Sequence, residues 1–329
     1  MVKNQWYVVL LASDVKVGQA VGCTRFGTKL VLWRDHNQQV HCIYDRCIHR
    51  GVSLCKGEVK NNHIMCPFHG FEFDGSGRCV LIPANGQVTP VPKGFQTQAY
   101  RVVEKYGYLW LYYSDQFPET DEVPFFSDLA AENGAAFATN DFVDLWETHY
   151  TRAVENQLDV VHLPFIHRKT IGKGNKTIVN GPYLEVDEEQ MIIRTYNEVD
   201  HGQKPKSAQE IAEQVLQKEY KLEFRMPALW QNHVFDKLRI TIAFSPIDEE
   251  HTMIYMRTWQ KIMTVPGLKQ VLNWQSMRQA IQVLYEDKYV VESQEPKATS
   301  LRMGEKLIKG DQPIIVFRQM RERLLQEMD

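Results

Sequence analysis

The sequence predicts an α+β protein of two domains, the first all β and the second an antiparallel sheet covered by a long helix. The chain has 329 residues, a length that by itself suggests two domains. Its first hundred or so residues are rich in short β-forming runs, whereas residues 236–245 alternate between apolar and polar side chains and precede a long helical pattern. We expect the domains to occupy residues 1–115 and 116–329.

Three runs of β-branched and aromatic residues predict the strands of the N-terminal domain. Residues 27–33 and 40–44 are expected to pair across a turn at residues 35–38, and residues 108–113 form the last strand. The segment 114–125 is rich in Asp, Glu and Pro, which is typical of a linker. The N-terminal domain is therefore predicted to be a small sheet from which loops project.

The second domain is predicted to open with a helix and to continue as an antiparallel sheet. The helix should run from about Asp144 to Leu163 and stop at Pro164. Strands at residues 184–186 and 191–194 flank an acidic turn. From Asp236 to Ser245 the apolar residues fall on one face, which indicates an antiparallel sheet with one buried face.

Two later helices are expected to complete this domain. A long one, from about Pro266 to Glu295, should cover the buried face of the sheet, and an amphipathic one should run from about Asp311 to Glu327. The segment from His201 to Glu219 is expected from its polar composition to be an insertion or a lid.

Composition excludes several classes of protein. The chain is 43% hydrophobic and 24% charged, which is ordinary for a globular protein, and its net charge of −3 gives no broad basic field for nucleic acid. It has no window of about 18 uncharged apolar residues, so we expect no membrane span. The N-terminus lacks the apolar core and cleavage site of a signal peptide. With six cysteines, the reducing cytoplasm is the expected compartment.

The most informative motif is a pair of short metal-ligand patterns, Cys47-x-His49 and Cys66-x-x-His69. Each lies in a tight polar loop that contains a glycine, Gly51 in the first and Gly70 in the second. Two thiolates and two imidazoles suit a [2Fe-2S] cluster in which one iron takes both cysteines and the other both histidines. Imidazole ligands raise the reduction potential to about −150 to +300 mV, so such a cluster passes on single electrons from a stronger reductant.

Other interpretations of this motif remain open at the level of sequence. Two cysteines and two histidines are also a structural zinc set. A disulfide between Cys47 and Cys66 would leave two histidines unused. The other four cysteines, Cys23, Cys42, Cys55 and Cys79, are expected to be buried free thiols. Cys55 lies close to the cluster loops in sequence, and the roles of Cys55 and Cys79 stay open.

A second group of potential ligands stands in the helix predicted before Pro164. Asp159 and His162 are three positions apart, so they would share a helix face. If Pro164 breaks the helix, His167 can return beside His162. Two histidines and one carboxylate form the facial triad of non-heme Fe(II) oxygenases, which leaves positions open for O2 and substrate.

The carboxylate of this triad is expected to come from the long C-terminal helix. At about 100° per residue, Asp287 lies in the middle of the apolar stripe of residues 280–294, whereas Glu286 lies to one side and Glu292 farther round. A carboxylate that points into a core is costly unless it is paired or bound to a metal. That position selects Asp287, and a buried salt bridge to an Arg or Lys is the alternative.

Taken together, these residues resemble the catalytic α subunit of the Rieske non-heme iron oxygenases, over nearly the whole chain. At the cluster motif the resemblance includes the loop Cys66–Phe71. The one departure is in the other loop, where Ile48 stands at a position that is Pro in many members. The segment Glu286–Lys288 looks like the part that supplies the carboxylate in the subgroup without a β subunit, which includes vanillate and dicamba demethylases. The residues that match the mononuclear-iron motif are Asn156, Asp159, His162 and His167.

The resemblance implies a fold, an assembly and a path for electrons. The first domain would be a Rieske [2Fe-2S] domain and the second a helix-grip, an antiparallel sheet around a long helix that holds one Fe2+. Three subunits would form a head-to-tail homotrimer, since the two metal sites of one subunit are too far apart for fast electron transfer. Asp159 would accept hydrogen bonds from His162 of its own chain and from His69 of the neighbour, and so couple the centres.

The expected function is that of an oxidoreductase, an NAD(P)H-dependent Rieske monooxygenase of aromatic compound metabolism. A separate reductase or ferredoxin would deliver electrons, and one atom of O2 would enter a C–H bond of a small organic substrate. If that carbon bears O or N, the product would lose a methyl group as formaldehyde. The alternatives are a ring-hydroxylating cis-dioxygenase of the same family and an electron carrier without chemistry of its own. The sequence does not name the substrate.

Overall fold

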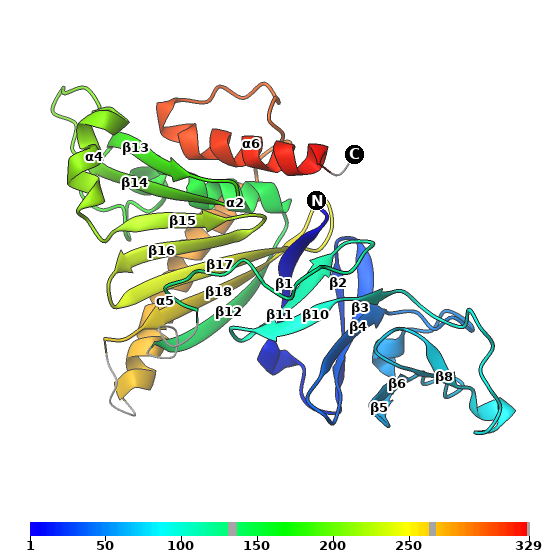
Figure 1. Ribbon diagram of the computed structural model, residues 1–329. Helices are drawn as coiled ribbons and strands as arrows, with labels where there is room; N and C mark the ends of the chain where they lie inside the picture. The colour runs from blue at the N-terminus through cyan, green and yellow to red at the C-terminus, as the bar shows by residue number, and fades with distance from the viewer. Residues whose placement is uncertain (131–136, 263–267, 328–329) are drawn as a thin grey trace. The chain divides into compact units, whose positions relative to one another are not determined.

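The computed structural model describes residues 1–130, 137–262 and 268–327. The chain divides into two compact units, Lys3–Val123 and Pro124–Asp329. Figure 1 shows the first as a set of small sheets and the second as one broad sheet with helices.

The first unit is built from three small antiparallel sheets and short 3-10 turns. One sheet has the order β1-β11-β10, another β2-β3-β4-β9 and the third β5-β6-β7-β8. The strands are β1 Gln5–Leu11, β2 Ala20–Arg25, β3 Thr28–Arg34, β4 Val40–Tyr44, β5 Glu58–Lys60, β6 His63–Met65, β7 Glu72–Phe73, β8 Cys79–Leu81, β9 Ala99–Tyr100, β10 Val102–Lys105 and β11 Tyr108–Tyr113. The 3-10 turns are η1 Ala12–Asp14, η2 Leu54–Lys56 and η3 Pro83–Asn85.

The strands predicted for this unit are confirmed. β3 and β4 pair across the expected turn, with Leu30 opposite Tyr44 and Arg34 opposite Val40, and β11 occupies the predicted residues 108–113. No regular element occurs from Ser114 to Val123, as expected of a linker.

The second unit is organised around a seven-stranded antiparallel sheet. Its order is β12-β18-β17-β16-β15-β14-β13, so the chain runs back and forth from β13 to β18 while β12 forms the far edge (Figure 1). The strands are β12 Ala138–Trp146, β13 Ile178–Val186, β14 Gln190–Glu198, β15 Lys221–Arg225, β16 Leu229–Phe235, β17 Leu238–Pro246 and β18 Thr252–Gln260.

Helices cover one face of this sheet. The ring of Tyr285 on α5 meets Phe142 on β12, with centroids 6.0 Å apart, and Phe317 on α6 meets Phe224 on β15, with centroids 5.3 Å apart. Figure 1 shows α5 running behind the sheet. The helices are α2 Tyr150–Leu158, α3 Leu163–Ile166, α4 Ala208–Leu216, α5 Leu268–Val291 and α6 Gln312–Gln326, with the 3-10 turn η4 Lys309–Asp311. The α+β class and the antiparallel sheet with a long helix are therefore confirmed.

The helix predicted over residues 144–163 is wrong at both ends. Asp144 belongs to β12, because that strand pairs with β18 along its whole length and takes these residues into the sheet. The helix α2 ends at Leu158 with Asp159 as its C-cap, so Asp159 and His162 do not share a helix face. Pro164 does not stop a helix but stands in the first turn of α3, where a missing N–H is tolerated.

Two further expectations need correction, and the segment expected to be an insertion or a lid proves to be packed into the unit. The strand β17 is buried on both faces in its second half, including Thr241 and Ser245, so the sheet does not have only one buried face. The polar segment 201–219 contains α4, whose Ile211 and Val215 are buried, so it is an ordered part of the unit. The long helix ends at Val291 rather than 295, and its predicted start at Pro266 lies outside the described residues.

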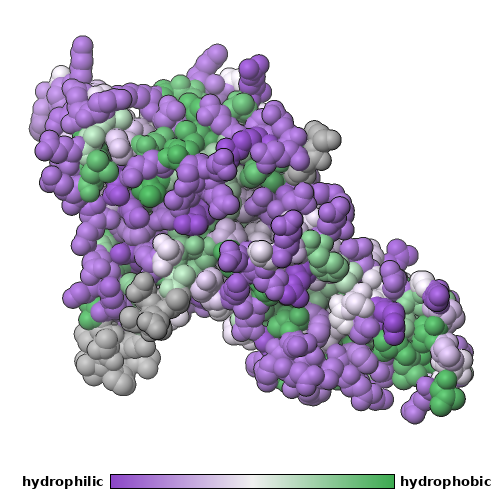
Figure 2. All heavy atoms as spheres, in the orientation of Figure 1, coloured by the Kyte–Doolittle hydropathy of each residue, from purple (hydrophilic) through white to green (hydrophobic). Residues whose placement is uncertain are grey.

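The surface gives no sign of a membrane span. Within residues 1–130, 137–262 and 268–327, no helix is long and apolar enough to cross a bilayer. Figure 2 shows a mainly hydrophilic face, on which hydrophobic residues form small patches rather than one band.

Candidate metal centres

The two loops of the Cys-His motifs have the same backbone design. In each, the cysteine N–H donates to the carbonyl of the residue five positions later, and the glycine N–H donates back to the cysteine carbonyl. Gly51 and Gly70 have φ of +73° and +72°, a left-handed conformation that glycine adopts without strain. The bonds are Cys47 N to Val52 O, 2.8 Å, Gly51 N to Cys47 O, 2.9 Å, Cys66 N to Phe71 O, 2.8 Å, and Gly70 N to Cys66 O, 3.0 Å.

The loops bring the four predicted cluster ligands together. The Nδ1 atoms of His49 and His69 lie 3.1 Å apart, and both rings are exposed, whereas the thiols of Cys47 and Cys66 are buried. Burial, with the neighbouring Cys66 thiol, raises the pKa of Cys47 to about 11. A metal would therefore have to displace thiol protons as it binds.

This donor set fits a [2Fe-2S] cluster. The two thiols form part of an apolar core with Leu54, Ile64 and Phe73, while both imidazoles converge at the solvent side. Ligands of two kinds on two sides match a cluster with one cysteine-bound and one histidine-bound iron. The histidine side would then be the side at which electrons can leave.

A second group of ligand atoms meets inside the second unit. Asp287 Oδ1 on α5 lies 2.9 Å from His167 Nε2 and 3.6 Å from His162 Nε2. One ligand atom from each of the three residues can be chosen so that all lie within 4.8 Å of one another. His167 and Asp287 are almost fully buried, and no Lys or Arg among the described residues pairs with Asp287. The buried ion pair considered for Asp287 is therefore not what the structure shows.

These three residues fit a mononuclear metal ion. The approach of His167 to Asp287 does not have the angles of a hydrogen bond, so Asp287 Oδ1 is a buried oxygen without a donor among the described residues. Buried polar atoms without a partner are rare, and coordination of an ion is one of the ordinary explanations. Two imidazoles and one carboxylate are the ligand set of non-heme Fe(II) sites.

Glu286 supports this site in a role that the sequence did not reveal. Its Oε2 accepts hydrogen bonds from His167 Nδ1, 2.8 Å, and from Thr170 Oγ1, 2.7 Å. The carboxylate fixes the tautomer of His167, because Nδ1 must carry the proton and Nε2 is left free for a metal. Burial lowers the pKa of His167, but Asp287 and Glu286 outweigh it and hold that pKa above its usual value.

Removal of Glu286 tests this support. We expect Glu286→Ala to lower the affinity for the mononuclear metal by about 10–100-fold, because His167 loses the acceptor that orients its ring. Metal retained during titration with a chelator gives the affinity. Glu213→Ala, at an exposed position on α4, is the matched control and should retain the metal. Equal retention by both variants would show that Glu286 does not orient His167.

Asp287 is also held from the side of α2. Gln157 Nε2 donates to Asp287 Oδ2 over 3.3 Å, which leaves Oδ1 turned toward the two histidines. Gln157 stands in the last turn of α2, so the placement of that helix sets the orientation of the carboxylate.

Asp159 caps α2 beside this group. Its Oδ1 accepts from the N–H of Val161, 2.6 Å, and of His162, 3.2 Å, while Oδ2 lies 3.7 Å from His162 Nδ1, beyond hydrogen-bond distance. Burial raises the pKa of Asp159, but His162 and the two amides outweigh it and hold that pKa below its usual value. The carboxylate therefore stays charged near neutral pH, beside the candidate ligand His162.

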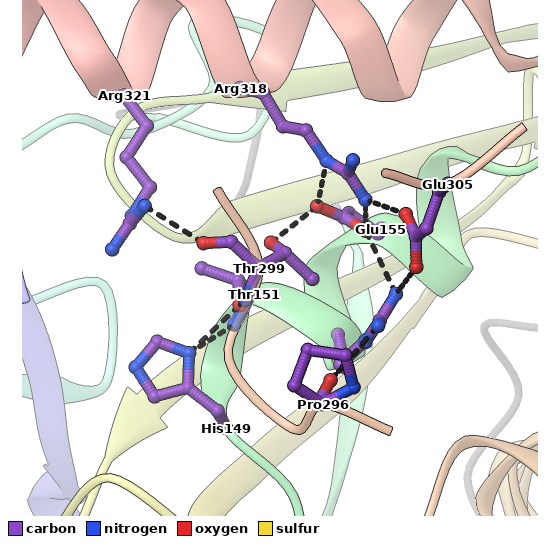
Figure 3. A network of polar contacts seen from close by, with 9 residues as sticks. His149, Thr151, Glu155, Pro296, Thr299, Glu305, Arg318 and Arg321 are labelled. Atoms are coloured by element: carbon purple, nitrogen blue, oxygen red, sulfur yellow. Dashed lines mark hydrogen bonds and ion pairs between the residues drawn. The ribbon is translucent and has the colours of Figure 1, made fainter. Parts of the chain in front are cut away.

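A buried network of charges fixes α2 to the C-terminal part of the chain (Figure 3). Arg318 on α6 donates to both oxygens of Glu155, from Nε over 2.8 Å and from Nη2 over 2.7 Å, and Nη2 also reaches Glu305 over 2.6 Å. Thr299 Oγ1 donates to Glu155 over 2.5 Å, and Arg152 Nη1 donates to Glu305 over 2.7 Å. The positive charges of two arginines thus balance the negative charges of two glutamates. Arg152, Glu155 and Arg318 are nearly completely buried.

The network and the ligand group act on opposite sides of the same helix. Glu155 and Gln157 are two positions apart on α2, so at 3.6 residues per turn their side chains leave the helix in nearly opposite directions. The ion pairs hold one side, and the other side presents Gln157 to Asp287. The network therefore sets the position from which α2 supports the site.

Comparison with known protein families assigns both units. A model of the Rieske [2Fe-2S] domain matches residues 5–97. A model of the vanillate O-demethylase oxygenase C-terminal domain matches residues 146–327, which is more than half of the chain.

Individual relatives show the same relationship. Chloroplastic protein TIC 55 of Pisum sativum is 31% identical over 173 residues, which cover 51% of this chain and 30% of TIC 55. The oxygenase component of dicamba O-demethylase from Stenotrophomonas maltophilia is 30% identical over 167 residues, 51% of this chain and 48% of the relative. The matched segment is thus less than half the length of either relative.

A solved structure shares the fold of the whole chain. The crystal structure of dicamba monooxygenase bound to dicamba matches with a TM-score of 0.79 and 21% identity, over 100% of this chain and 98% of that one. At this identity the likeness shows the arrangement of the elements.

Proposed function

Since the chain belongs to the Rieske non-heme iron oxygenases with a C-terminal domain of the vanillate O-demethylase type, we propose that it is the oxygenase component of a monooxygenase. One oxygen atom of O2 would enter a C–H bond of a small organic substrate, and the other would leave as water after two electrons and two protons are taken up. A methyl group on O or N would be lost as formaldehyde once its carbon is hydroxylated.

The observation that carries this proposal is the meeting of His162, His167 and Asp287. Their ligand atoms lie within 4.8 Å of one another, although Asp287 is more than a hundred positions from the histidines in sequence. An electron carrier needs only the cluster loops, so a second buried ligand group in the other unit favours an enzyme. Zinc at the Cys-His loops is disfavoured because the matching family model is that of a [2Fe-2S] domain.

Each group of residues has a defined part in this proposal. Cys47, His49, Cys66 and His69 would hold the [2Fe-2S] cluster, and His162, His167 and Asp287 would hold Fe2+. When bound, these cofactors would supply one-electron transfer and activation of O2. Three protein ligands leave open positions for O2 and substrate. Glu286 accepts the Nδ1 proton of His167 and so turns Nε2 toward the site, and Gln157 keeps Asp287 Oδ1 aimed at the histidines.

The partners belong to the proposal as well. Electrons would come from NAD(P)H through a separate reductase or ferredoxin, and would leave the cluster at the exposed His69. We propose a head-to-tail homotrimer, in which His69 of one copy approaches Asp159 of the next. The domain limits 1–115 and 116–329 and a location in the cytoplasm remain predictions from the sequence.

One experiment tests the class of the reaction. The protein, purified without oxygen, should be red-brown from the cluster, and a colourless protein with zinc would contradict the proposal. After chemical reduction, the protein is given isotope-labelled O2 and a panel of methylated and aromatic acids for a single turnover. The products should be either a hydroxylated acid with one labelled oxygen atom or a demethylated acid together with formaldehyde. Two labelled atoms in a cis-diol would assign the dioxygenase alternative instead.

A further inference from the structure

We propose that the substrate is an organic anion, and that Lys173, Lys176 and Lys218 at the mouth of a pocket beside the iron-ligand segment select it by charge. The proposal rests on the proposed oxygenase function and names the class of its substrate. The pocket has a volume of about 370 Å³, within the range of about 300–1,000 Å³ that small-molecule sites occupy.

The pocket lies between the ligand segment and the helix-covered face of the sheet. Leu163 and Pro164, which follow His162 directly, form one wall. Leu222 on β15 forms the other, and it is two positions from Phe224, so both side chains point to the face on which α6 packs. A molecule in this pocket is therefore on the side of the sheet where the candidate iron ligands meet.

The charge around this pocket is of one sign. The three lysines are exposed at its rim, and no Asp or Glu is among the described residues that line it. The chain as a whole carries a net charge of −3, so the positive rim is a local feature. A cleft lined by charges of one sign concentrates ligands of the opposite sign and speeds their entry.

The lysines stand on segments with fixed positions. Gly172 N donates to His167 O over 2.9 Å, directly before Lys173. A Cβ on Gly172 would lie 1.9 Å from Leu163 O, so only glycine lets this loop lie against α3. Asn197 on β14 donates to Lys176 O over 3.3 Å, and Lys218 Nζ lies 4.8 Å from the centre of the Tyr196 ring. The rim is therefore tied to the backbone of a candidate iron ligand.

Deeper on the same face, the sheet offers polar atoms without protein partners. Asn232 is paired with Leu222 and Trp230 with Phe224, so both side chains share the face of the pocket. Trp230 Nε1 and Asn232 Oδ1 are buried and have no hydrogen-bond partner among the described residues. Neither residue lines the pocket, whose own lining includes Leu163, Pro164 and Leu222 and suits an apolar substrate body.

Binding without turnover provides the test. The oxidised holoenzyme, without reductase, is titrated by calorimetry with 4-methoxybenzoate and with its neutral analogue 4-methoxybenzamide. The acid should bind about tenfold more tightly than the amide, the size expected from three solvent-exposed charge interactions. The advantage should disappear between about 10 mM and 1 M salt, as the screening length falls from about 30 to 3 Å.

Charge-neutral variants assign the effect to the rim. The triple variant K173Q/K176Q/K218Q should lose the advantage of the acid and bind the amide as before. The control K60Q/K93Q/K237Q removes the same charge from exposed lysines elsewhere and should behave as the unmodified protein. If the acid binds no better than the amide, or the rim variant keeps its preference, the proposal is wrong.

Turnover separates this proposal from the function on which it rests. Lysine-dependent binding of the acid without any oxidation product would leave the pocket assignment standing and overturn the monooxygenase. If the protein oxidises neutral compounds equally well with and without the rim lysines, the monooxygenase function would stand and the selection of an anion by these lysines would be overturned.

Discussion

Replacing Asp159 by Asn should leave both metals bound and lower turnover by about 10–100-fold or more, the range for residues that orient and couple metal ligands. The amide oxygen of Asn can still accept from the N–H groups of Val161 and His162, so the turn that follows α2 should survive. What is lost is the negative charge beside His162, and with it the acceptor proposed to serve His69 of a neighbouring copy.

The measurements are metal content, the visible spectrum of the cluster, and the rate at which reduced cluster is reoxidised in the presence of substrate and O2. Asp187→Asn is the matched control, because Asp187 accepts from Glu189 N and Gln190 N in the same kind of turn on the surface. The control should keep its reoxidation rate. Unchanged reoxidation in Asp159→Asn would show that this carboxylate does not couple the centres.

Replacing Arg318 by Met should destabilise the second unit by about 3–5 kcal/mol, the cost of leaving a buried charge without its partner. Glu155 is 5% exposed and would keep Thr299 as a hydrogen-bond donor and Arg152 Nη1 at 3.7 Å from its Oε2, but Arg152 would then be shared with Glu305, so two buried carboxylates would face one cation. Because α2 depends on this network, loss of the mononuclear metal should precede global unfolding as denaturant is added.

Unfolding in urea, followed by circular dichroism, measures the change in stability. Arg323→Met on the same helix is the control, since its exposed side chain lies 4.0 Å from the exposed Glu327 and donates to Glu188 O at the surface, and it should cost less than about 1 kcal/mol. The double variant E155Q/R318M removes both charges and should recover part of the loss. A double variant as unstable as the sum of its parts would show that the two charges do not act together.

Short sequence patterns were sufficient to predict the four ligands of the cluster loops. Cys47, His49, Cys66 and His69 lie within two five-residue turns, so their spacing and the glycines already limit the geometry, and the structure brings the four side chains together. Periodicity was also sufficient to select Asp287, since its place on an apolar stripe depends only on the 3.6-residue repeat of one helix.

Helix and strand boundaries near the site could not be predicted in the same way. The residues before α2 have helical spacing, but β12 pairs with β18 and takes Asp144 into the sheet, a contact between segments more than a hundred positions apart. The second buried face of β17 has the same origin. The local preference for a helix is overridden where pairing with a distant strand stabilises the segment more.

What the sequence by itself determined is therefore the chemistry: which residues can bind metal, that one chain carries two candidate metal sites of different kinds, and the α+β class. The tertiary structure alone decided which oxygen of Asp287 faces the histidines, that Glu286 orients His167, that Arg318 and Glu155 anchor α2, and that lysines from two distant loops meet at one pocket. The physical reason is range. Ligand type and periodicity act over a few positions along the chain, whereas orientation, charge pairing and cavities arise between segments that only folding brings into contact.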